Sequence, residues 1–506
     1  MLSLALMSER SENILRKTAN TSVILAAGAC LILLAARIYF AISFVTPYLL
    51  STTGFEWENS FNLWKFIQHQ AIYTDPHRIP FTVSYYNWGY YYFYGWMTKA
   101  GLSLLRLDVI WIPTVGRLIS LVFTLIAGAI FWMATRTFIK AGPFAHGPLA
   151  WAWPIIVTCS PLVGFWSITV RADMGALALE AAGLYVILHY LRKQDERLIV
   201  VAALLFYAAW SFKQSSVTML AGSALVLLLL KRWRAFLTLS SIWWILVIVT
   251  LVAGGPVYRE NILFSQKHYP MPIALGLENI MRAVEKNPFF LLCVGAILAL
   301  SVRKLRLLAS RPIEAALTFT VLFSCCFAFI TACKIGASDN YYIPAAWAAM
   351  LGFALIAERM NVTCMLAGLA VFSWILVVAV ALVPVGKTFY YTYRYQDVVH
   401  RSIAEKLSHL PGPAFVQEPY SNLPWVQRFS PHFVIPDTYS YDRDAGVPLE
   451  DGGWEGLARE GYFATLVLYR GYQPPASMLA KYALVDQYRQ DGYMAFDFYR
   501  RIAPAP

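Results

Sequence analysis

The chain of 506 residues is too apolar to be a soluble globular protein. Hydrophobic residues make up 58% of it, charged residues make up only 14%, and the mean hydropathy is +0.53. An ordinary globular domain contains about 25% charged residues. The net charge of +12 comes from basic residues divided among separate short loops, which argues against nucleic acid as a partner because nucleic-acid binding needs a continuous basic face.

Apolar runs near the length of a bilayer-spanning helix recur along the chain. The first run is too long for the apolar part of a signal peptide and lacks a small-residue cleavage site, so it is predicted to be a transmembrane helix. The sequence therefore predicts an α-helical polytopic membrane protein with about eleven transmembrane helices. The runs lie at residues 22–45, 111–134, 149–167, 174–191, 198–212, 216–230, 236–254, 288–302, 313–333, 343–357 and 363–385.

Basic residues fall on alternate loops, which the positive-inside rule makes cytoplasmic. We expect a cytoplasmic N-terminus, a periplasmic C-terminus and, from the short loops and the lack of a eukaryotic retention signal, a bacterial inner membrane. The basic positions are Arg10, Arg16, Lys17, Arg136, Lys140, Arg192, Lys193, Arg197, Lys231, Arg232, Arg234, Arg303, Lys304, Arg306 and Arg359.

Three long segments are then exterior: residues 46–106, residues 255–287 and the tail. We expect a transmembrane domain over residues 1–386, which includes the first two segments, and a periplasmic α/β module over residues 387–506. Within the tail, an amphipathic helix near 396–409 and strands near 414–417 and 463–468 predict that module.

Helical spacing of apolar residues predicts a membrane-interface helix in each of the first two exterior segments. The aromatic run at 85–94 predicts either a belt at the lipid headgroups or a wall that binds sugar or lipid. The residues with this spacing are Trp57, Phe61, Trp64 and Ile67 in the first segment, and Leu277, Ile280, Met281 and Val284 in the second.

Three exterior turns each keep a cation, although exterior loops are otherwise poor in cations: Arg171, Lys213 and Lys334. Ionisable groups at a membrane rim are costly, so each needs a reason. A single one is explained by a side chain that reaches for the headgroups. Together they predict a cationic patch suited to the phosphate of a membrane lipid.

Glu56 and Glu58 directly follow the first apolar run, as either solvated loop charges or a catalytic base. A carboxylate can accept a proton from an attacking hydroxyl, while cations stabilise a leaving phosphate. On a helix the two side chains would point about 200° apart, so only one could face a site; in an extended segment both could.

Three ionisable residues lie deeper in the apolar runs and are predicted to form buried pairs: Arg37, Arg117 and Glu180. The seven cysteines lie in or beside apolar runs, and the histidines do not have metal-ligand spacing, so neither a disulfide framework nor a metal site is predicted. The sequence also contains no phosphate-binding loop for a soluble nucleotide.

Four local patterns resemble the GT-C superfamily of integral-membrane glycosyltransferases, which includes protein O-mannosyltransferases and the lipid A aminoarabinose transferase. They are Gly54-Phe-Glu-Trp-Glu58, Ile72-Tyr-Thr-Asp-Pro76 with Pro80-Phe81, Arg171-Ala-Asp-Met-Gly-Ala-Leu-Ala178, and Lys213-Gln214 with the segment from Lys334 to Tyr341. This chain has Glu-Trp-Glu where many relatives carry Asp-Glu, and Tyr86-Asn-Trp-Gly-Tyr90 in place of a Tyr-Pro-Pro-like stretch.

The resemblance implies a polyprenyl-phosphate sugar donor, membrane lipids around the protein and a glycan, lipid or protein acceptor. It implies Glu56 or Glu58 as the base, with the first favoured, and Arg171, Lys213 and Lys334 as ligands of the donor phosphate. No cofactor is implied with certainty, and no spacing supports a divalent cation. The residues implied to bind substrate are Asp75, Arg78, Tyr86, Asp173, Asn340 and Tyr341.

Two other functions compete with glycosyl transfer. A transporter or flippase of a lipid-linked sugar would share the basic rim and the aromatic residues, but it would more often show repeated halves and interrupted helices. A structural or assembly partner could keep the same fold without activity.

Overall fold

The computed structural model describes residues 2–42, 56–303, 310–357, 360–383, 387–417, 431–470, 472–489 and 496–502. Several predicted features fall partly or wholly outside these residues, among them positions 54–55 of the acidic motif, positions 304–306 of one basic cluster, and Arg359. The chain divides into two compact units, each formed by discontinuous segments. The first comprises Met1–Tyr39, Ser120–Val249 and Pro270–Phe389, and the second comprises Phe40–Ile119, Thr250–Tyr269 and Tyr390–Pro506.

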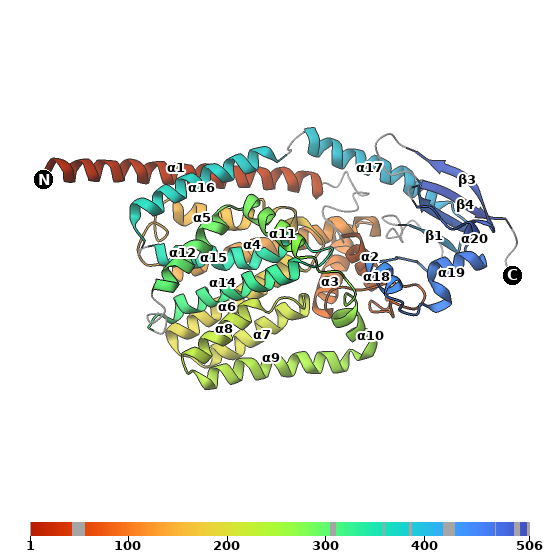
Figure 1. The fold of residues 1–506 in the computed structure, drawn as a ribbon, viewed down its shortest axis with the longest axis horizontal. Coiled ribbons are helices and arrows are strands. Elements are labelled where there is room, and N and C mark those ends of the chain that lie inside the picture. The colour runs from red at the N-terminus through yellow and green to blue at the C-terminus, as the bar shows by residue number, and fades with distance from the viewer. Residues whose placement is uncertain are drawn as a thin grey trace. The chain divides into compact units, whose positions relative to one another are not determined.

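The first unit is helical throughout its described part, and each predicted apolar run contains a helix (Figure 1). Its elements are α1 (Leu2–Ala41), α4 (Ile112–Phe138, whose first residues belong to the second unit), α5 (Leu149–Cys159), η2 (Gly164–Ile168), α6 (Asp173–Lys193), α7 (Arg197–Phe212), α8 (Thr218–Leu229), α9 (Trp233–Ala253), α11 (Ile273–Lys286), α12 (Phe289–Arg303), α14 (Pro312–Ala332), η4 (Asp339–Tyr342), α15 (Ile343–Ile356) and α16 (Val362–Leu382).

Among the described residues, six helices are long and apolar enough to cross a membrane: Ser11–Tyr39, Val109–Phe138, Asp173–Lys193, Trp233–Ala253, Pro312–Ala332 and Val362–Leu382. Shorter apolar helices accompany them at Leu149–Cys159, Arg197–Phe212, Thr218–Leu229 and Phe289–Ala299. By helix composition this is a multi-pass membrane protein. The predicted number of about eleven spans includes these shorter helices, which do not reach the length of a full span.

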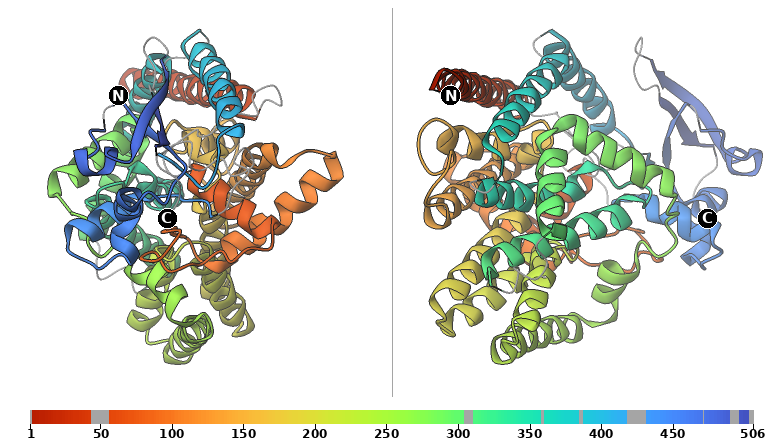
Figure 2. Two further views of the ribbon diagram at one scale, coloured as in Figure 1. Left: turned by 90° about the vertical axis from the view of Figure 1, so that its right-hand side faces the viewer. Right: turned by 60° about the vertical axis from the view of Figure 1, so that its left-hand side comes forward.

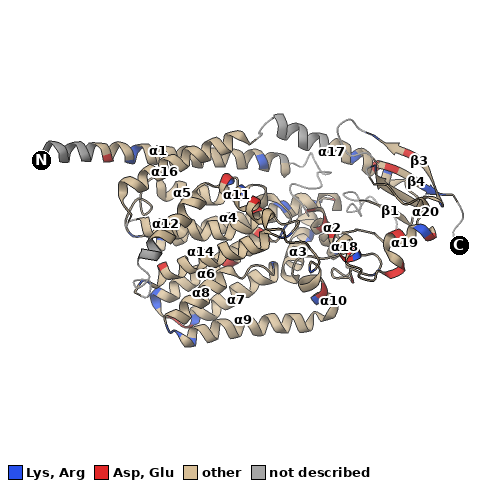
Figure 3. Cartoon of the chain, in the orientation of Figure 1, with Lys and Arg blue, Asp and Glu red and all other residues tan. Residues whose placement is uncertain are grey.

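Small residues let neighbouring helices of the first unit approach closely. A Cβ added to Gly222 of α8 would lie 2.5 Å from the Thr320 Cα of α14, so only glycine permits this contact. Gly183 of α6 likewise packs against the Phe206 ring of α7. Small residues at such contacts are typical of helices that associate within a membrane. Figure 3 shows that charged residues are sparse along these helices and gather toward their ends.

The amphipathic helix predicted in the second exterior segment is α11, which belongs to the first unit. It buries Gly276 and Ala283 and exposes Ile273, Leu277 and Met281 on another face. An exposed apolar face on a short helix fits the predicted membrane-interface position.

The second unit contains the helices of the first exterior segment. The elements outside the tail are α2 (Glu56–Ile67), α3 (Trp88–Leu105), η1 (Val109–Trp111), α10 (Gly255–Arg259) and η3 (Glu260–Phe264). The helix predicted around Trp57 is confirmed as α2, but nine of its twelve residues are buried, including Glu56, Glu58 and Lys65. Its side chains pack into protein rather than into a membrane interface.

From Trp88 onward the aromatic run is helical, and its rings divide between two faces of α3. Tyr90, Tyr91 and Tyr94 are fully buried, whereas Tyr92 and Trp96, one turn apart, are about half exposed. The buried rings pack on one another, with 4.6 Å between the centroids of Tyr90 and Tyr94. The run therefore forms an aromatic core on one side and an exposed aromatic face on the other.

The tail forms the predicted α/β module around a four-stranded mixed sheet with strand order β1-β2-β4-β3 (Figure 2). β1 pairs with β2 in parallel, with Ala414 opposite Thr465, while β4 is antiparallel to both β2 and β3. The elements of the tail are α17 (Lys387–Ser408), β1 (Ala414–Val416), α18 (Asp437–Asp444), η7 (Glu450–Gly452), α19 (Gly453–Glu460), β2 (Thr465–Tyr469), α20 (Ala476–Leu479), β3 (Tyr482–Tyr488) and β4 (Phe496–Arg501).

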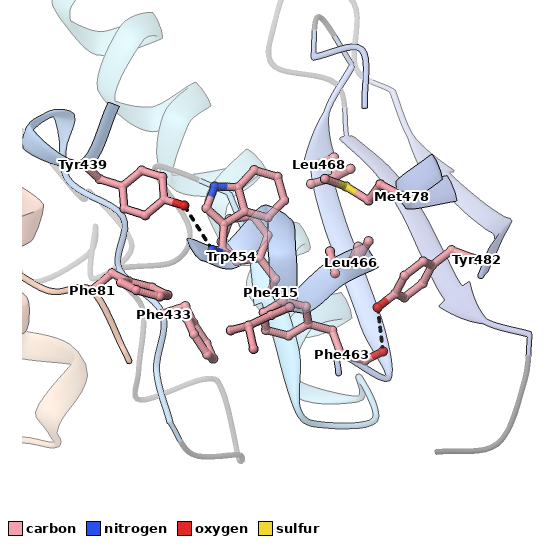
Figure 4. Packing of buried hydrophobic residues seen from close by; sticks show 12 residues of the cluster. Phe81, Phe415, Phe433, Tyr439, Trp454, Phe463, Leu466, Leu468, Met478 and Tyr482 are labelled. Carbon is pink, nitrogen blue, oxygen red and sulfur yellow. Dashed lines mark hydrogen bonds between the residues drawn. The ribbon is translucent and has the colours of Figure 1, made fainter. Parts of the chain in front are cut away.

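Alternating side chains give this sheet two apolar faces. Val467 of β2 packs with Val399 and Ile403 of α17 on one face. Leu466 and Leu468 point to the other face, where the cluster drawn in Figure 4 includes Trp454, Met478 and Phe81. Phe81 comes from the first exterior segment, so that segment supplies part of the core of the tail module. The predicted domain boundary at residue 386 remains a prediction.

Candidate functional site

Glu56 forms a closed ion pair with Arg117 in the second unit. Arg117 donates from Nε to Oε1 at 2.8 Å and from Nη2 to Oε2 at 3.0 Å, and its Nη1 donates to the Ala41 carbonyl at 3.1 Å. Both side chains are inaccessible to solvent, at 0% and 1% exposed. This bidentate geometry uses both carboxylate oxygens. The buried pairing predicted for Arg117 is confirmed, with Glu56 as its partner.

Glu58 lies on a different face of α2, because two residues on a helix are rotated by about 200°. Its charge acts on the phenols of Tyr85, Tyr91 and Tyr269. The pKa of Tyr85 lies well above its ordinary value because of burial first and of Glu58 next. Burial is also the main reason why the pKa values of Tyr91 and Tyr269 are raised, and Glu58 raises both further. The charge of Glu58 therefore acts on three phenol groups.

In the first unit, Asp173 joins residues from three segments of the chain. Its carboxylate accepts hydrogen bonds from Arg171 Nε at 3.1 Å, from Lys213 Nζ at 2.6 Å and from Asn340 Nδ2 at 2.6 Å. Asp173 is the first residue of α6, where a negative charge is favoured by the helix dipole. Three predicted site residues, Arg171, Lys213 and Asn340, therefore meet at the carboxylate of a fourth, Asp173.

Two aromatic rings complete this cluster. The Arg171 guanidinium lies 4.9 Å from the Trp166 ring centroid, and Lys213 Nζ lies 4.5 Å from that of Tyr341. Both are cation–π distances. Rings in these positions cover the cations without neutralising them.

The phenol of Tyr341 places Lys334 in the same surroundings. Burial raises the pKa of a phenol, yet the pKa of Tyr341 is lowered because the positive charges of Lys334, Lys213 and Arg171 outweigh burial. All three predicted cations therefore act on one side chain. We refer to Arg171, Lys213 and Lys334, together with Asp173, as the cation cluster. Its three cations outnumber Asp173 and the Glu180 carboxylate that lines the adjoining cavity, which favours an anionic ligand.

A small cavity, part of it open to solvent, lies beside the cation cluster. Glu180 lines it and is fully buried, and its Oε1 accepts a hydrogen bond from the Met219 backbone N–H at 3.0 Å. Cations, hydroxyls and carboxylates around one space suit a polar, anionic ligand. The polar residues of the lining are Asp173, Glu180, Lys213, Ser215, Ser216, Thr218, Asn340 and Tyr341.

The remaining predicted site residues belong to the second unit and do not form one group. Asp75 and Arg78 share a turn, with 3.5 Å between Arg78 Nε and an Asp75 carboxylate oxygen, and Arg78 is largely exposed. Tyr86 is buried, its ring lies 5.2 Å from that of Tyr90, and its carbonyl accepts a hydrogen bond from the Tyr73 hydroxyl.

Asp442 of α18 was not predicted from the sequence, and it binds two histidines. Its Oδ2 lies 2.9 Å from His77 Nε2, and its Oδ1 lies 2.7 Å from His268 Nδ1. We call these three residues the clamp. In the part of the chain that the structure describes, no group of three His, Cys, Asp or Glu side chains is arranged to hold a metal ion. His77 in the first exterior segment and His268 in the second were the available signal, but the carboxylate that joins them is far away in sequence.

Glu180 and Arg37, the other two residues predicted to form buried pairs, have partners of different kinds. Glu180 accepts hydrogen bonds rather than forming an ion pair through its Oε1. The Arg37 guanidinium lies 4.6 Å from the Phe165 ring centroid, a cation–π distance.

Scans against protein-family models and against curated protein sequences give no match. Solved structures of the oligosaccharyltransferase of Archaeoglobus fulgidus are similar to this chain. The apo form is 12% identical with a TM-score of 0.43, over 84% of this chain and 64% of that one. The complex with Zn and sulfate is 12% identical with a TM-score of 0.45, over 92% and 72%. The complex with an inhibitory peptide and a dolichol-phosphate is 11% identical with a TM-score of 0.44, over 93% and 74%.

This chain therefore spans less than two thirds of the apo oligosaccharyltransferase chain. Identities of 11–12% and TM-scores below 0.5 establish no activity for the chain. The functional proposal therefore rests on the residues of this chain.

Proposed function

We propose that this protein is a membrane glycosyltransferase of the GT-C type that moves a sugar from a polyprenyl-phosphate donor to an acceptor hydroxyl on the exterior face. The cation cluster carries this proposal, because its positive charges outnumber the carboxylates of Asp173 and Glu180 and it adjoins a polar cavity. A phosphate is the anionic group of a membrane lipid that such a cluster suits. The acceptor is a glycan, a lipid or a protein.

In the proposed reaction, the acceptor oxygen attacks the anomeric carbon of the donor sugar. The bond between that carbon and the phosphate oxygen breaks, and the lipid phosphate leaves with the electron pair. Arg171, Lys213 and Lys334 stabilise the charge that develops on the phosphate. A carboxylate takes the proton from the acceptor hydroxyl. Asp173 and Asn340 hold Lys213 and Arg171 in place, and Asp75, Arg78 and Tyr86 remain proposed substrate contacts.

We assign the base to Glu58 rather than to Glu56, which the sequence favoured. Both oxygens of Glu56 already accept hydrogen bonds from Arg117. Protonating Glu56 would break this pair and leave a buried guanidinium without its counterion, which costs roughly 3–5 kcal/mol. Glu58 lies on another face of α2, and its charge acts on the phenols of Tyr85, Tyr91 and Tyr269.

Binding of a polyprenyl phosphate to the purified, reconstituted protein tests the role of the cation cluster. We expect Lys213→Gln and Lys334→Gln each to weaken binding by roughly tenfold, the loss expected for one charge-assisted contact of about 1.4 kcal/mol. Arg282→Gln is the matched control, because it removes a cation of the same unit that is half exposed and paired with Glu278 on the same helix.

Three results are informative. Wild-type binding and transfer in both lysine variants would contradict the phosphate role. Binding that weakens in the lysine variants, combined with a wild-type protein that translocates the lipid-linked sugar without transferring it, would favour the transporter instead. Binding that weakens only in the lysine variants, together with transfer by the wild type, supports the proposal.

A further inference from the structure

Helix α18 of the tail contacts both exterior segments of the second unit through one carboxylate. Asp442 is almost fully buried, at 3% exposed, and each of its oxygens binds a different imidazole. His77 belongs to the segment that follows α2, and His268 belongs to the segment that follows η3. One side chain of the tail therefore ties together two segments separated by nearly two hundred residues.

One helical turn before Asp442, on the same face of α18, Thr438 contacts two tyrosine hydroxyls. Its Oγ1 lies 2.9 Å from the Tyr85 hydroxyl and 3.2 Å from the Tyr269 hydroxyl. The two tyrosine hydroxyls are 3.3 Å apart. These are two of the phenols on which the charge of Glu58 acts.

Other contacts also hold the first two exterior segments to the tail. The Glu450 backbone N–H donates to the His77 carbonyl at 3.0 Å, and the Ile79 N–H donates to the Glu450 carboxylate at 2.8 Å. The Tyr269 ring lies 4.7 Å from that of Tyr441. Asp442, like Thr438, bonds to both exterior segments at once, and it does so through its charged carboxylate.

We propose that Asp442 is a positioning residue that, by holding His77 and His268 together, seats Tyr85 and Tyr269 against Thr438 beside Glu58. The tail module thereby completes the surroundings of Glu58. The link to Glu58 rests on the proposed function, whereas the placement of the two tyrosines does not depend on it.

The strength with which the clamp holds Tyr85 and Tyr269 in place should depend on pH. The pKa of His77 is raised because it hydrogen bonds to Asp442, against the opposing effect of burial, and Asp75 and Glu260 also raise it. Burial would raise the pKa of Asp442, but the bonds to His77 and His268 lower it. Lys267 faces Glu260 at 3.5 Å.

The ion pair between protonated His77 and ionised Asp442 is therefore fully formed below the ordinary histidine pKa of about 6.5 and above the pKa of Asp442. It weakens as pH rises through the raised pKa of His77. We expect tighter seating at about pH 5.5 than at about pH 8.5.

Amide hydrogen exchange of the full-length reconstituted protein tests the seating. Asp442→Asn should lower the protection factors of residues 84–91 and 266–270 by about tenfold, the effect of losing a charge-assisted hydrogen bond. It should also remove the pH dependence that the wild type shows there. Asp444→Asn is the matched control, because it removes the same charge from the same helix at a largely exposed position paired with Arg443.

A second variant guards against general unfolding. His268→Gln should lower protection around Tyr269 and leave protection around His77 near the wild-type value. Wild-type protection in both Asp442→Asn and His268→Gln, or equal losses in Asp442→Asn and Asp444→Asn, would overturn the proposal.

Transfer activity separates this inference from the proposed function. If the wild type transfers sugar, Asp442→Asn should lower kcat by about tenfold and leave the KM for the donor unchanged, since Asp442 touches neither substrate nor donor. An unchanged kcat would overturn the step that links the clamp to Glu58. If the wild type transfers no sugar, the proposed function fails, and the exchange results alone decide whether Asp442 seats the tyrosines.

Discussion

Two buried charge clusters of this protein differ in how they are balanced. In the second unit, Glu56 and Arg117 match one carboxylate with one guanidinium, and both carboxylate oxygens are used. In the first unit, Asp173 binds two cations and Lys334 adds a third nearby, beside a cavity. The ion pair of Glu56 and Arg117 accounts for both of its charges, whereas the cations beside the cavity are the basis of the proposed phosphate site.

The same difference separates the two glutamates with which the acidic motif begins. Their spacing alone makes them equivalent, since both follow an apolar run and both are buried. The hydrogen bonds from Arg117 show that the Glu56 carboxylate is already engaged. The proposal of Glu58 as the base starts from this pairing rather than from burial, which the two glutamates share.

The largest effect on stability should follow from removing one partner of the ion pair between Glu56 and Arg117. We expect Arg117→Leu to lower the free energy of unfolding by roughly 3–5 kcal/mol, because it leaves the buried Glu56 carboxylate without its counterion. Chemical denaturation in detergent, followed by tryptophan fluorescence, measures this change. Replacing both partners in Glu56→Leu/Arg117→Leu should restore much of the loss, since no buried charge then remains.

Arg282→Leu serves as the control for this experiment. Its exposed partner Glu278 lies one turn away on α11, and such pairs contribute roughly 0.3–0.5 kcal/mol. If Arg117→Leu were no more destabilising than Arg282→Leu, Glu56 would not need Arg117, and the contrast between the clusters would disappear.

A smaller effect should appear in the cation cluster. Asp173→Asn removes the carboxylate that binds Arg171 and Lys213, so the ligand-free protein should lose about 1–3 kcal/mol of stability. A bound polyprenyl phosphate would supply the missing negative charge. We therefore expect this lipid to raise the unfolding midpoint of Asp173→Asn more than that of the wild type, in the same denaturation assay. An equal or smaller shift would show that the phosphate does not bind there.

The helical part of the fold is predictable because apolar runs are a local property of the sequence. Every predicted run contains a helix, and the two predicted strands lie close to β1 at Ala414–Val416 and β2 at Thr465–Tyr469, whereas β3 and β4 were not predicted. The contribution of Phe81 to the core of the tail is not predictable in this way, because it depends on a contact between distant segments. The amphipathic pattern of α2 likewise did not predict its burial, because burial depends on contacts with distant segments.

In the candidate site, too, local sequence patterns predicted some residues, whereas contacts between distant residues were not predicted. Arg171, Lys213 and Lys334 stood out because cations are rare in exterior turns, and the structure brings all three to Tyr341. The pairing of Glu56 with Arg117 joins residues 61 positions apart. The clamp joins His77 to Asp442 across 365 positions. No local spacing signals contacts of this kind, so the choice between Glu56 and Glu58 needed the structure.

The most direct test of the proposed reaction compares sugar transfer by Glu58→Gln and Glu56→Gln. The assay uses purified protein in liposomes, a polyprenyl-phosphate sugar as donor, and the unfolding midpoint of each variant as a check on folding. We predict that Glu58→Gln lowers kcat by roughly 100-fold or more, the contribution of a general base, while it keeps donor binding and the wild-type midpoint. Transfer by Glu58→Gln at the wild-type rate, with transfer lost in a stably folded Glu56→Gln, would contradict the assignment of Glu58 as the base.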